Sequence, residues 1–387
     1  MRFLHTADWH LGKLFGQRYQ TEDQRYVLGE LLSLAKDECV DAVVIAGDIF
    51  DRSVPPAEAV DLMSEVLARF AELRLPVLYI AGNHDSASRI DFGRTVLAKS
   101  RVYLAGHVRQ GAAPVVLEDA DGPVYVSLLP FASPLEVREA FGVESALTYD
   151  EAMALVVADA RAQIPGGARS IAVAHAFLAG GVSSESERPL SVGGTDQVRP
   201  AHFTAYNYTA LGHLHGPQRA GAETIRYSGS LLKYSFDEAA QRKGVIIVDM
   251  DKDGGVSQKF VPLTPRHDVR IVTGMMSELM SDGFDPLPHD DYVRVDLLDT
   301  DTILNAYEKL QAVYPNLFTL TRPNWRPKDA DALAVQSHEE QKKKSDVTLF
   351  CEFFSDNTEQ HEQLTDEQRQ VVIDCFDEME RERREQA

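Results

Sequence analysis

The sequence predicts an α/β protein with a layered core, in which helices cover buried strands. Short runs of aliphatic and β-branched residues end at Gly, Asp or the residue before His, a pattern typical of strands that are buried on both faces. Helical patterns separate some of these runs, at residues 25–36 and 57–73. Alternating strands and helices indicate layered α/β architecture. The runs are residues 2–4, 42–46, 76–81, 171–174 and 209–211.

A short polar motif follows each of the five runs. In open α/β sheets, ligands bind beyond the carboxyl ends of the strands, so we expect the five motifs to meet at one edge. Any one motif alone is weak evidence, but five in this order indicate a single site. The motifs contain Asp8 and His10, Asp48 and Asp51, Asn83 and His84, His175, and His213 and His215.

The residue types in these motifs predict a site for two divalent cations. Carboxylate, amide and imidazole groups suit Mn²⁺ or Fe²⁺. Asp8 and His10 are two residues apart, so in an extended segment both side chains point the same way. The carboxylate of Asp48 can bridge two cations. Such a pair, roughly 3.5–4 Å apart, polarises a phosphoryl oxygen and supplies hydroxide near neutral pH.

His84 is predicted to act on the substrate without binding a metal. It follows the expected ligand Asn83, and its imidazole could stabilise the transition state or protonate the leaving oxygen. A lone histidine is more often structural than a ligand. However, five of the 12 histidines lie at predicted strand ends, which favours the metal site. We expect Asp85 to shape the turn, and Asp51 to lie behind the ligands or to face DNA. The histidines expected at the surface or in packing are His5, His107, His202, His267, His289, His338 and His361.

Longer stretches around the motifs resemble the SbcD family of bacterial nuclease subunits, relatives of Mre-type nucleases in the calcineurin-like metallophosphoesterase superfamily. The resemblance covers nearly the whole chain and is most specific over residues 1–240. It implies a four-layer metallophosphoesterase β-sandwich flanked by helices, with a small α/β capping domain and a C-terminal helical segment. The stretches that carry it are residues 6–13 (TADWHLGK), 46–52 (AGDIFDR), 82–86 (GNHDS) and 227–231 (YSGSL).

The resemblance also implies the ligand set and the reaction. Asp48 would be shared by both metals, and His84 would be the catalytic histidine. The implied activity is Mn²⁺-dependent 3′–5′ exonuclease cleavage of double-stranded DNA and endonuclease cleavage of single strands and hairpins, with an SbcC-type ATPase, in DNA repair, recombination and replication. Asp51 departs from the histidine usual in the archaeal and eukaryotic branch. The implied ligands are Asp8, His10, Asp48 and His215 for metal one, and Asp48, Asn83, His175 and His213 for metal two.

Bulk properties favour a cytoplasmic enzyme. The three cysteines, Cys39, Cys351 and Cys375, are scattered and lack zinc spacing, which indicates a reducing compartment. No apolar run reaches the length of a membrane span. A cleavable leader would remove Asp8, so we expect none.

The net charge of −21 is unusual for a protein that binds nucleic acid on its own. Positive charge from bound metals, a DNA path lined by basic residues, or a partner's surface could compensate. Lys13, Arg18, Arg52 and Arg89 are candidates for such a path, although each alone could be an ordinary surface charge.

Composition and residue pattern divide the chain into four segments, and the resemblance implies a role for each. We predict a nuclease domain at residues 1–265, a capping domain at 266–330, a polar linker at 331–347 and a partner-binding segment at 348–387. In the capping domain we expect strands at residues 292–297 and 317–320 and a helix at 302–314. This domain could cap the active site and help to select DNA, or it could be a packing subdomain.

The last segment and two earlier helices are candidate interfaces. Thr365 and Gln368 form a capping-box pattern before an apolar stripe, which could dock on the SbcC-type ATPase or pack on its own domain. Helices expected at residues 57–73 and 88–98 carry apolar faces that could form a homodimer or pack on the chain's own sheet.

Two other functions use the same residues. A metallophosphoesterase acting on a small phosphodiester or a phosphoprotein would need the same seven ligands. A non-catalytic tether for DNA ends would not need His84. The capping unit and the C-terminal segment favour a nuclease over the first, and the full ligand set with His84 favours it over the second.

Overall fold

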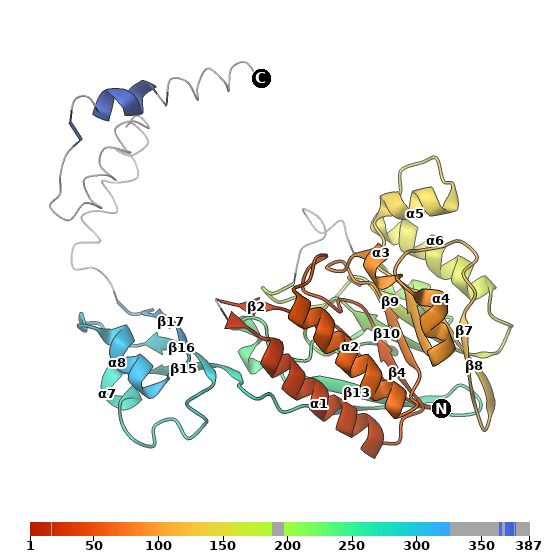
Figure 1. Cartoon of the computed structure of the whole chain (residues 1–387), viewed down its shortest axis with the longest axis horizontal. Helices are drawn as coiled ribbons and strands as arrows, with labels where there is room; N and C mark the ends of the chain where they lie inside the picture. Colours follow the sequence, from red (N-terminus) through yellow and green to blue (C-terminus); the bar gives the residue numbers. More distant parts are fainter. Residues whose placement is uncertain (17, 188–196, 326–363, 366–367, 375, 377–387) are drawn as a thin grey trace. The chain divides into compact units, whose positions relative to one another are not determined.

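The computed structural model describes residues 1–16, 18–187, 197–325, 364–365, 368–374 and 376. These residues form two compact units, one of residues 1–297 and 305–321, and a second of residues 298–304 and those from 322 onward. Figure 1 shows the course of the chain. The predicted linker lies outside the described residues, as does most of the partner-binding segment.

The first six-stranded sheet carries three of the five motifs. Its order is β14-β13-β1-β4-β5-β6, with parallel pairing from β1 to β6 and antiparallel pairing at the β13 and β14 edge. The strands are β1 (Arg2–Thr6), β4 (Ala42–Ile45), β5 (Val77–Ile80), β6 (Val102–Ala105), β13 (Gly244–Met250) and β14 (Val256–Pro262).

The second six-stranded sheet carries the other two motifs. Its order is β11-β12-β10-β9-β8-β7, parallel from β12 to β8 and antiparallel at both edges. The strands are β7 (Val115–Asp119), β8 (Gly122–Leu129), β9 (Arg169–His175), β10 (Tyr208–Gly212), β11 (Gln218–Ala220) and β12 (Ala222–Tyr227).

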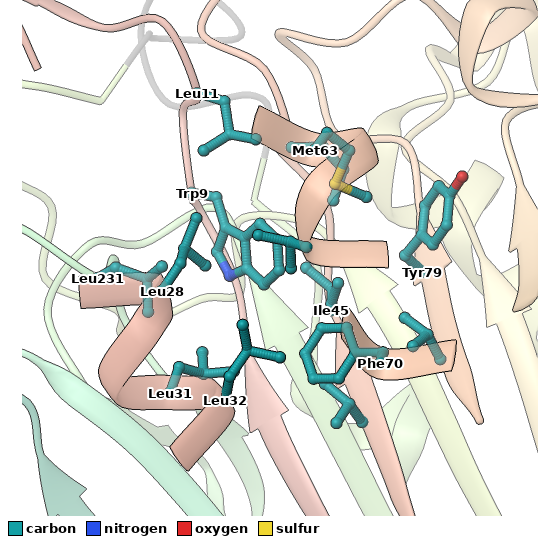
Figure 2. Close-up of a cluster of buried hydrophobic side chains, with 14 of the residues drawn as sticks. Trp9, Leu11, Leu28, Leu31, Leu32, Ile45, Met63, Phe70, Tyr79 and Leu231 are labelled. Carbon is teal, nitrogen blue, oxygen red and sulfur yellow. The ribbon is translucent and has the colours of Figure 1, made fainter. Parts of the chain in front are cut away.

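Alternate residues of each strand face different layers, and this produces the predicted four-layer sandwich. In β4, Val44 packs between the two sheets with Val173 and Tyr208, whereas Val43 and Ile45 pack under helices. The helices over the first sheet are α1 (Thr21–Asp37) and α2 (Ala57–Glu72). Figure 2 shows Trp9 within this layer, beside Leu28 and Leu31 of α1 and near Phe70 of α2.

Helix α6 (Tyr149–Ala162) covers the second sheet, preceded by α5 (Pro134–Phe141). Both helices begin with a capping box, Ser133 with Glu136 and Thr148 with Glu151, which satisfies backbone N–H groups of the first turn. Short 3₁₀ helices occur at η1 (Ala98–Ser100), η2 (Pro200–Phe203) and η3 (Asp237–Ala240), and β2 (Leu14–Phe15) pairs with β3 (Arg18–Tyr19).

The helix predicted at residues 88–98 is interrupted. The structure has two short helices, α3 (Ala87–Ile90) and α4 (Arg94–Leu97), separated by Gly93 with φ of 72°. A residue with positive φ ends a right-handed helix, so the apolar residues of this stretch do not form one continuous face.

The predicted capping domain contains a three-stranded parallel sheet in the order β15-β16-β17. Its helix is shorter than predicted, because Asn305 adopts a left-handed conformation just before it. This sheet belongs to the same compact unit as residues 1–265, and the boundary at 265 remains a proposal. The elements are β15 (Val269–Gly274), α7 (Met276–Leu279), β16 (Tyr292–Leu297), α8 (Ala306–Val313) and β17 (Leu317–Thr321).

Aromatic and ionic contacts attach this sheet to the first sandwich layers. Phe318 of β17 stacks on Phe15, with ring centroids 4.7 Å apart. Asp23 of α1 accepts a hydrogen bond from the hydroxyl of Tyr292 at 2.8 Å and pairs with His267 at 2.7 Å. A small aromatic cluster and a bidentate acceptor therefore anchor the sheet.

Candidate metal centre

The five motifs meet at one edge of the sandwich, as the sequence predicts. The backbone joins the first two: the N–H of Asp8 donates to the carbonyl of Gly47 at 3.1 Å, and that of His10 donates to Asp48 at 3.0 Å. The carboxylate of Asp8 then accepts the backbone N–H of His213, with oxygens at 2.9 and 3.1 Å, so a motif of the second sheet is fixed to one of the first.

Two groups of side chains have the spacing of metal ligands. In one, ligand atoms of His10, Asp48 and His84 lie within 4.8 Å of one another, and in the other those of Asp8, Asp48 and His175 do. Asp48 belongs to both groups. Its Oδ2 lies 3.7 Å from Nε2 of His10 and 3.4 Å from Nε2 of His175, which is the position of a bridging carboxylate.

The remaining predicted ligands complete these groups. Nε2 of His10 and Nε2 of His215 are 3.0 Å apart. Two ligand atoms about 2.1 Å from one cation and at right angles lie about 3 Å apart, so this spacing fits a shared metal. Oδ1 of Asn83 lies 2.9 Å from Nε2 of His175 and 3.0 Å from Nδ1 of His213. The donor set of oxygen and imidazole nitrogen therefore fits two divalent cations.

His84 is half-buried and held from two sides. Its backbone N–H donates to Asp48 at 2.9 Å, and its Nδ1 donates to the carbonyl oxygen of Asp51 at 2.8 Å. This tautomer leaves Nε2 available for a ligand or a substrate. His84 thus lies close enough to join the first group of ligands, although the resemblance gives it a catalytic role.

Burial and charge have opposite effects on the pKa values of the central groups. Burial raises the pKa of Asp8 well above its usual range. Burial alone would also raise the pKa of Asp48, but positive charge on His175 and a hydrogen bond from it hold this pKa well below the usual range. Burial lowers the pKa of His175, yet Asp48 reverses this and raises it to about 9. In the metal-free protein, His175 and Asp48 therefore form a buried ion pair.

Three of the predicted ligands adopt an unfavourable backbone conformation. Asp8, His10 and Asp48 have φ values of 52°, 47° and 48°, in the left-handed region. Non-glycine residues there cost roughly 1 kcal/mol or more each. The two sheets approach closely at this edge. A Cβ on Gly212 of the second sheet would lie only 1.9 Å from the carbonyl oxygen of Ala46, which directly follows β4 of the first sheet.

Asp85 and two of the basic residues predicted to line a DNA path make contacts within the protein. Asp85 accepts the backbone N–H groups of Ile49, Phe50 and Gly82 at 2.9–3.0 Å, so it joins two motifs rather than only shaping its own turn. Lys13 pairs with Asp51 at 2.9 Å, and Arg18 lies over the ring of Phe318 and donates to Asn316, so both basic side chains make internal contacts.

Sequence reasoning missed Glu238, Lys243 and Ser186. Glu238 is fully buried, pairs with Lys243 at 2.7 Å and lies 3.3 Å from Nδ1 of His215. Glu238 follows the stretch at residues 227–231 by only a few positions, but a single Glu in the short helix η3 gives no local signal of burial.

Comparison with known proteins gives the family. A family model described as calcineurin-like phosphoesterase matches residues 1–133, and one described as Type 5 capsule protein repressor C-terminal domain matches residues 265–358. A Staphylococcus epidermidis protein, named as the SbcD subunit of the nuclease SbcCD, is 32% identical over 367 residues, which cover 93% of this chain and 94% of that protein. This chain belongs to the SbcD family. It is a metal-dependent hydrolase of the nuclease class, and its phosphoesterase domain implies a dinuclear metal site.

Two solved structures also align with this SbcD-family chain. TT1561 of Thermus thermophilus is 14% identical, with a TM-score of 0.37, and covers 67% of this chain and 98% of its own. A dimetal phosphatase from Danio rerio is 13% identical, with a TM-score of 0.38, and covers 68% and 97%. At such TM-scores, neither adds to the family assignment. None of the helices among the described residues is long and apolar enough to cross a bilayer.

Proposed function

We propose that this chain is the DNA-cleaving subunit of a complex with an SbcC-type ATPase, and that it works as a Mn²⁺-dependent 3′–5′ exonuclease on double strands and an endonuclease on single strands and hairpins. The observation that carries the proposal is the position of Asp48 between two groups of ligand atoms. The similarity to the staphylococcal protein named as a nuclease SbcCD component supports the class of reaction and the partner.

The proposed ligands divide into two sets. Asp8, His10, Asp48 and His215 would hold metal one, and Asp48, Asn83, His175 and His213 would hold metal two. The 3.0 Å spacing of His10 and His215 supports the first set, and the approach of Asn83 to His175 and His213 supports the second. Oxygen and imidazole ligands suit Mn²⁺, while Mg²⁺ and Fe²⁺ are alternatives.

The chain's own residues would orient the phosphate and move a proton. Two bound cations would polarise the phosphoryl oxygen and supply a nucleophile near neutral pH. His84 donates Nδ1 to the carbonyl of Asp51, and this hydrogen bond orients Nε2. With both nitrogens protonated, His84 could stabilise the negative charge that develops on the phosphate or protonate the leaving oxygen.

The C-terminal segment, residues 348–387, is the proposed contact with the ATPase. Among its described residues, Thr365 and Gln368 form the predicted capping box, with hydrogen bonds of 3.0 and 3.3 Å. Deletion of residues 348–387 should abolish capture by an SbcC-type partner and spare Mn²⁺-dependent cleavage of single strands. Capture that survives the deletion would place the contact elsewhere. We also propose a polar linker at 331–347. The scattered cysteines support a cytoplasmic location.

A homodimer through α2 and the following short helices is also proposed. An apolar groove of about 530 Å³ lies there, lined in part by Val60, Met63, Leu67 and Phe92. Val60 remains 46% exposed and Phe92 83% exposed, whereas Met63 packs on the sheet. Large exposed apolar side chains beside a groove support a protein interface. Monomeric mass by light scattering at micromolar concentration would count against the dimer.

The proposal is tested by comparing wild type with His84→Ala on labelled single-stranded and hairpin DNA, with Mn²⁺, Mg²⁺ or EDTA. A generic phosphodiester dye is included as a small substrate. The expected result is DNA cleavage by wild type with Mn²⁺, and bound metal without cleavage in His84→Ala. Hydrolysis of the dye alone would indicate a small-substrate enzyme, and two bound metals without any cleavage would indicate a tether or a need for the partner.

A further inference from the structure

The two histidines proposed for metal one each have a carboxylate near the ring nitrogen that faces away from the metal. Nε2 atoms of His10 and His215 converge to 3.0 Å, so each ring directs Nδ1 back into the protein. Both rings are essentially buried, with exposures of 0% and 1%. The groups that meet Nδ1 decide which tautomer each ring adopts, and hence whether Nε2 offers a lone pair to a cation.

Asp51 lies behind His10. Its Oδ1 is 3.6 Å from Nδ1 of His10, a buried nitrogen that has no hydrogen-bond partner among the described residues. Lys13 is 2.9 Å from the same oxygen, and the side chain of Asp51 is 14% exposed. A shift of about 0.5 Å would bring Nδ1 and Oδ1 within hydrogen-bond distance. The carboxylate therefore faces His10 and Lys13, in the position predicted behind the ligands.

Glu238 lies behind His215, partly through a hydroxyl. Oγ of Ser186 is 2.6 Å from Nδ1 of His215 and donates to Oε1 of Glu238, which is itself 3.3 Å from Nδ1. Lys243 pairs with Oε2 at 2.7 Å and donates to the carbonyl of His215 at 2.8 Å. Ser184 and Ser235 also donate to Glu238, as expected for a carboxylate held as an acceptor.

The histidines proposed for metal two are supported differently. Nδ1 of His175 donates to the carbonyl oxygen of Ala46 at 2.9 Å, and Nδ1 of His213 faces the proposed ligand Asn83. Among the described residues, the only carboxylates that pair with His175 are the ligands Asp8 and Asp48. In the part of the chain that the structure describes, a carboxylate paired with a lysine thus backs both histidines of metal one and neither histidine of metal two.

We propose that Asp51 and Glu238 are positioning residues that make metal one the tighter of the two metal sites. Each carboxylate holds the proton of its histidine on Nδ1, which orients the ring and makes Nε2 a better donor to a cation. Loss of such a partner behind a ligand typically weakens metal affinity ~10–100-fold. Lys13 and Lys243 keep each carboxylate from being an unpaired buried charge. The inference rests on the proposed ligand sets.

The test titrates Mn²⁺ into EDTA-treated full-length protein by calorimetry and counts bound Mn²⁺ by electron paramagnetic resonance. The variants are Asp51→Asn and Glu238→Gln. Wild type should bind two ions with unequal affinities. Each variant should weaken the tighter site ~10–100-fold and leave the weaker one unchanged. Asp150→Asn is the matched control, because Asp150 backs His202 at 2.8 Å outside the metal centre, and it should bind as wild type does.

Circular dichroism and thermal unfolding in EDTA establish that each variant is folded. Glu238 is fully buried, so if Glu238→Gln does not fold, Ser186→Ala replaces it. This variant removes the hydroxyl that bridges Glu238 and His215 without changing a charge, and leaves only the 3.3 Å contact between them. Folded variants with two unchanged affinities would overturn the inference, as would equal weakening of both sites. Wild type that binds two ions but cuts no DNA, alone or with an SbcC-type partner, would defeat the proposed function and leave this inference standing, whereas wild type that binds fewer than two would defeat the ligand sets.

Discussion

Gly82 lies directly against the carboxylate of Asp48, the proposed bridging ligand. A Cβ built on Gly82 would stand 2.1 Å from Oδ1 of Asp48 and 2.4 Å from its backbone nitrogen. Neither atom can move freely, because Oδ1 accepts the N–H of His84 and the backbone of Asp48 accepts the N–H of His10. The space for this carboxylate therefore exists only because residue 82 has no side chain.

Gly82→Ala should displace Asp48 and weaken both proposed metal sites together, because Asp48 is common to both. We expect ~10–100-fold loss of DNA cleavage at limiting Mn²⁺, with both calorimetric affinities reduced. Gly166→Ala is the matched control, since a Cβ there meets no atom within 4 Å. Two unperturbed metal affinities in a folded Gly82→Ala protein would show that Asp48 does not bridge.

Metal uptake should release protons because His175 is protonated in the metal-free protein. Burial lowers its pKa, but the charge of Asp48 outweighs burial and raises the pKa to about 9. Below pH 9 a cation must displace this proton, so affinity at metal two should fall as pH falls. Calorimetry in two buffers of different ionisation enthalpy should record at least about one proton released at pH 7.5 and fewer above pH 9. A buffer-independent binding enthalpy at pH 7.5 would contradict the assignment.

His5 should make the fold sensitive to acid. It is fully buried, contacts the hydroxyl of Tyr208 at 3.0 Å and the carbonyl of Leu211 at 3.1 Å, and burial lowers its pKa to about 3. The unfolded chain binds a proton below about pH 6.5 and the folded chain does not until about pH 3, so stability falls as pH falls through this window. From pH 6.5 to 5 the loss is about 2 kcal/mol.

His5→Gln removes this titration and should therefore lose about 2 kcal/mol less than wild type between pH 7 and 5. Urea unfolding in EDTA at both pH values measures the difference. Burial likewise lowers the pKa of His213 to about 3. His213 is present in both proteins, so its contribution to the pH dependence cancels in the comparison. Parallel pH profiles for the two proteins would rule out His5 as the source.

Phe318→Ala should loosen the attachment of the β15-β16-β17 sheet. The ring of Phe318 stacks on Phe15 and lies near Phe236 and Tyr292, so truncation removes apolar contacts that join two parts of the unit. We expect the free energy of unfolding to fall by about 1–3 kcal/mol. Faster proteolysis around residues 262–266 would report it. Leu287→Ala, at a 52% exposed position in the same predicted domain, should be cleaved at the wild-type rate.

Local patterns in the sequence are sufficient for the strands, their layered arrangement and the position of the motifs. Apolar runs ending at Asp8, Asp48 and Asn83 are local signals, and parallel pairing brings their carboxyl ends together. The same reasoning fails for residues 88–98, where apolar spacing predicts a helix that Gly93 interrupts. The ligand sets, the role of His84 and the domain boundaries remain predictions.

The groups behind the ligands could not be predicted, because nothing local marks them. Glu238 lies 23 residues after His215, and its burial depends on Lys243 and Ser186, which approach only in the folded chain. A buried carboxylate is stable only with such partners, and their meeting is a property of tertiary structure. The sequence leaves two positions open for Asp51, and the contact with His10 supports the one behind the ligands.

The left-handed backbone at Asp8, His10 and Asp48 has a consequence for evolution. Glycine adopts this conformation without strain, so the backbone at these positions would accept glycine although the carboxylate or imidazole would be lost. A lineage released from selection for cleavage would therefore meet no backbone barrier to glycine at these positions, and only the lost side-chain contacts would oppose the replacement. Relatives that keep all twelve sandwich strands but carry glycine at these positions would then be recognisable as retired enzymes.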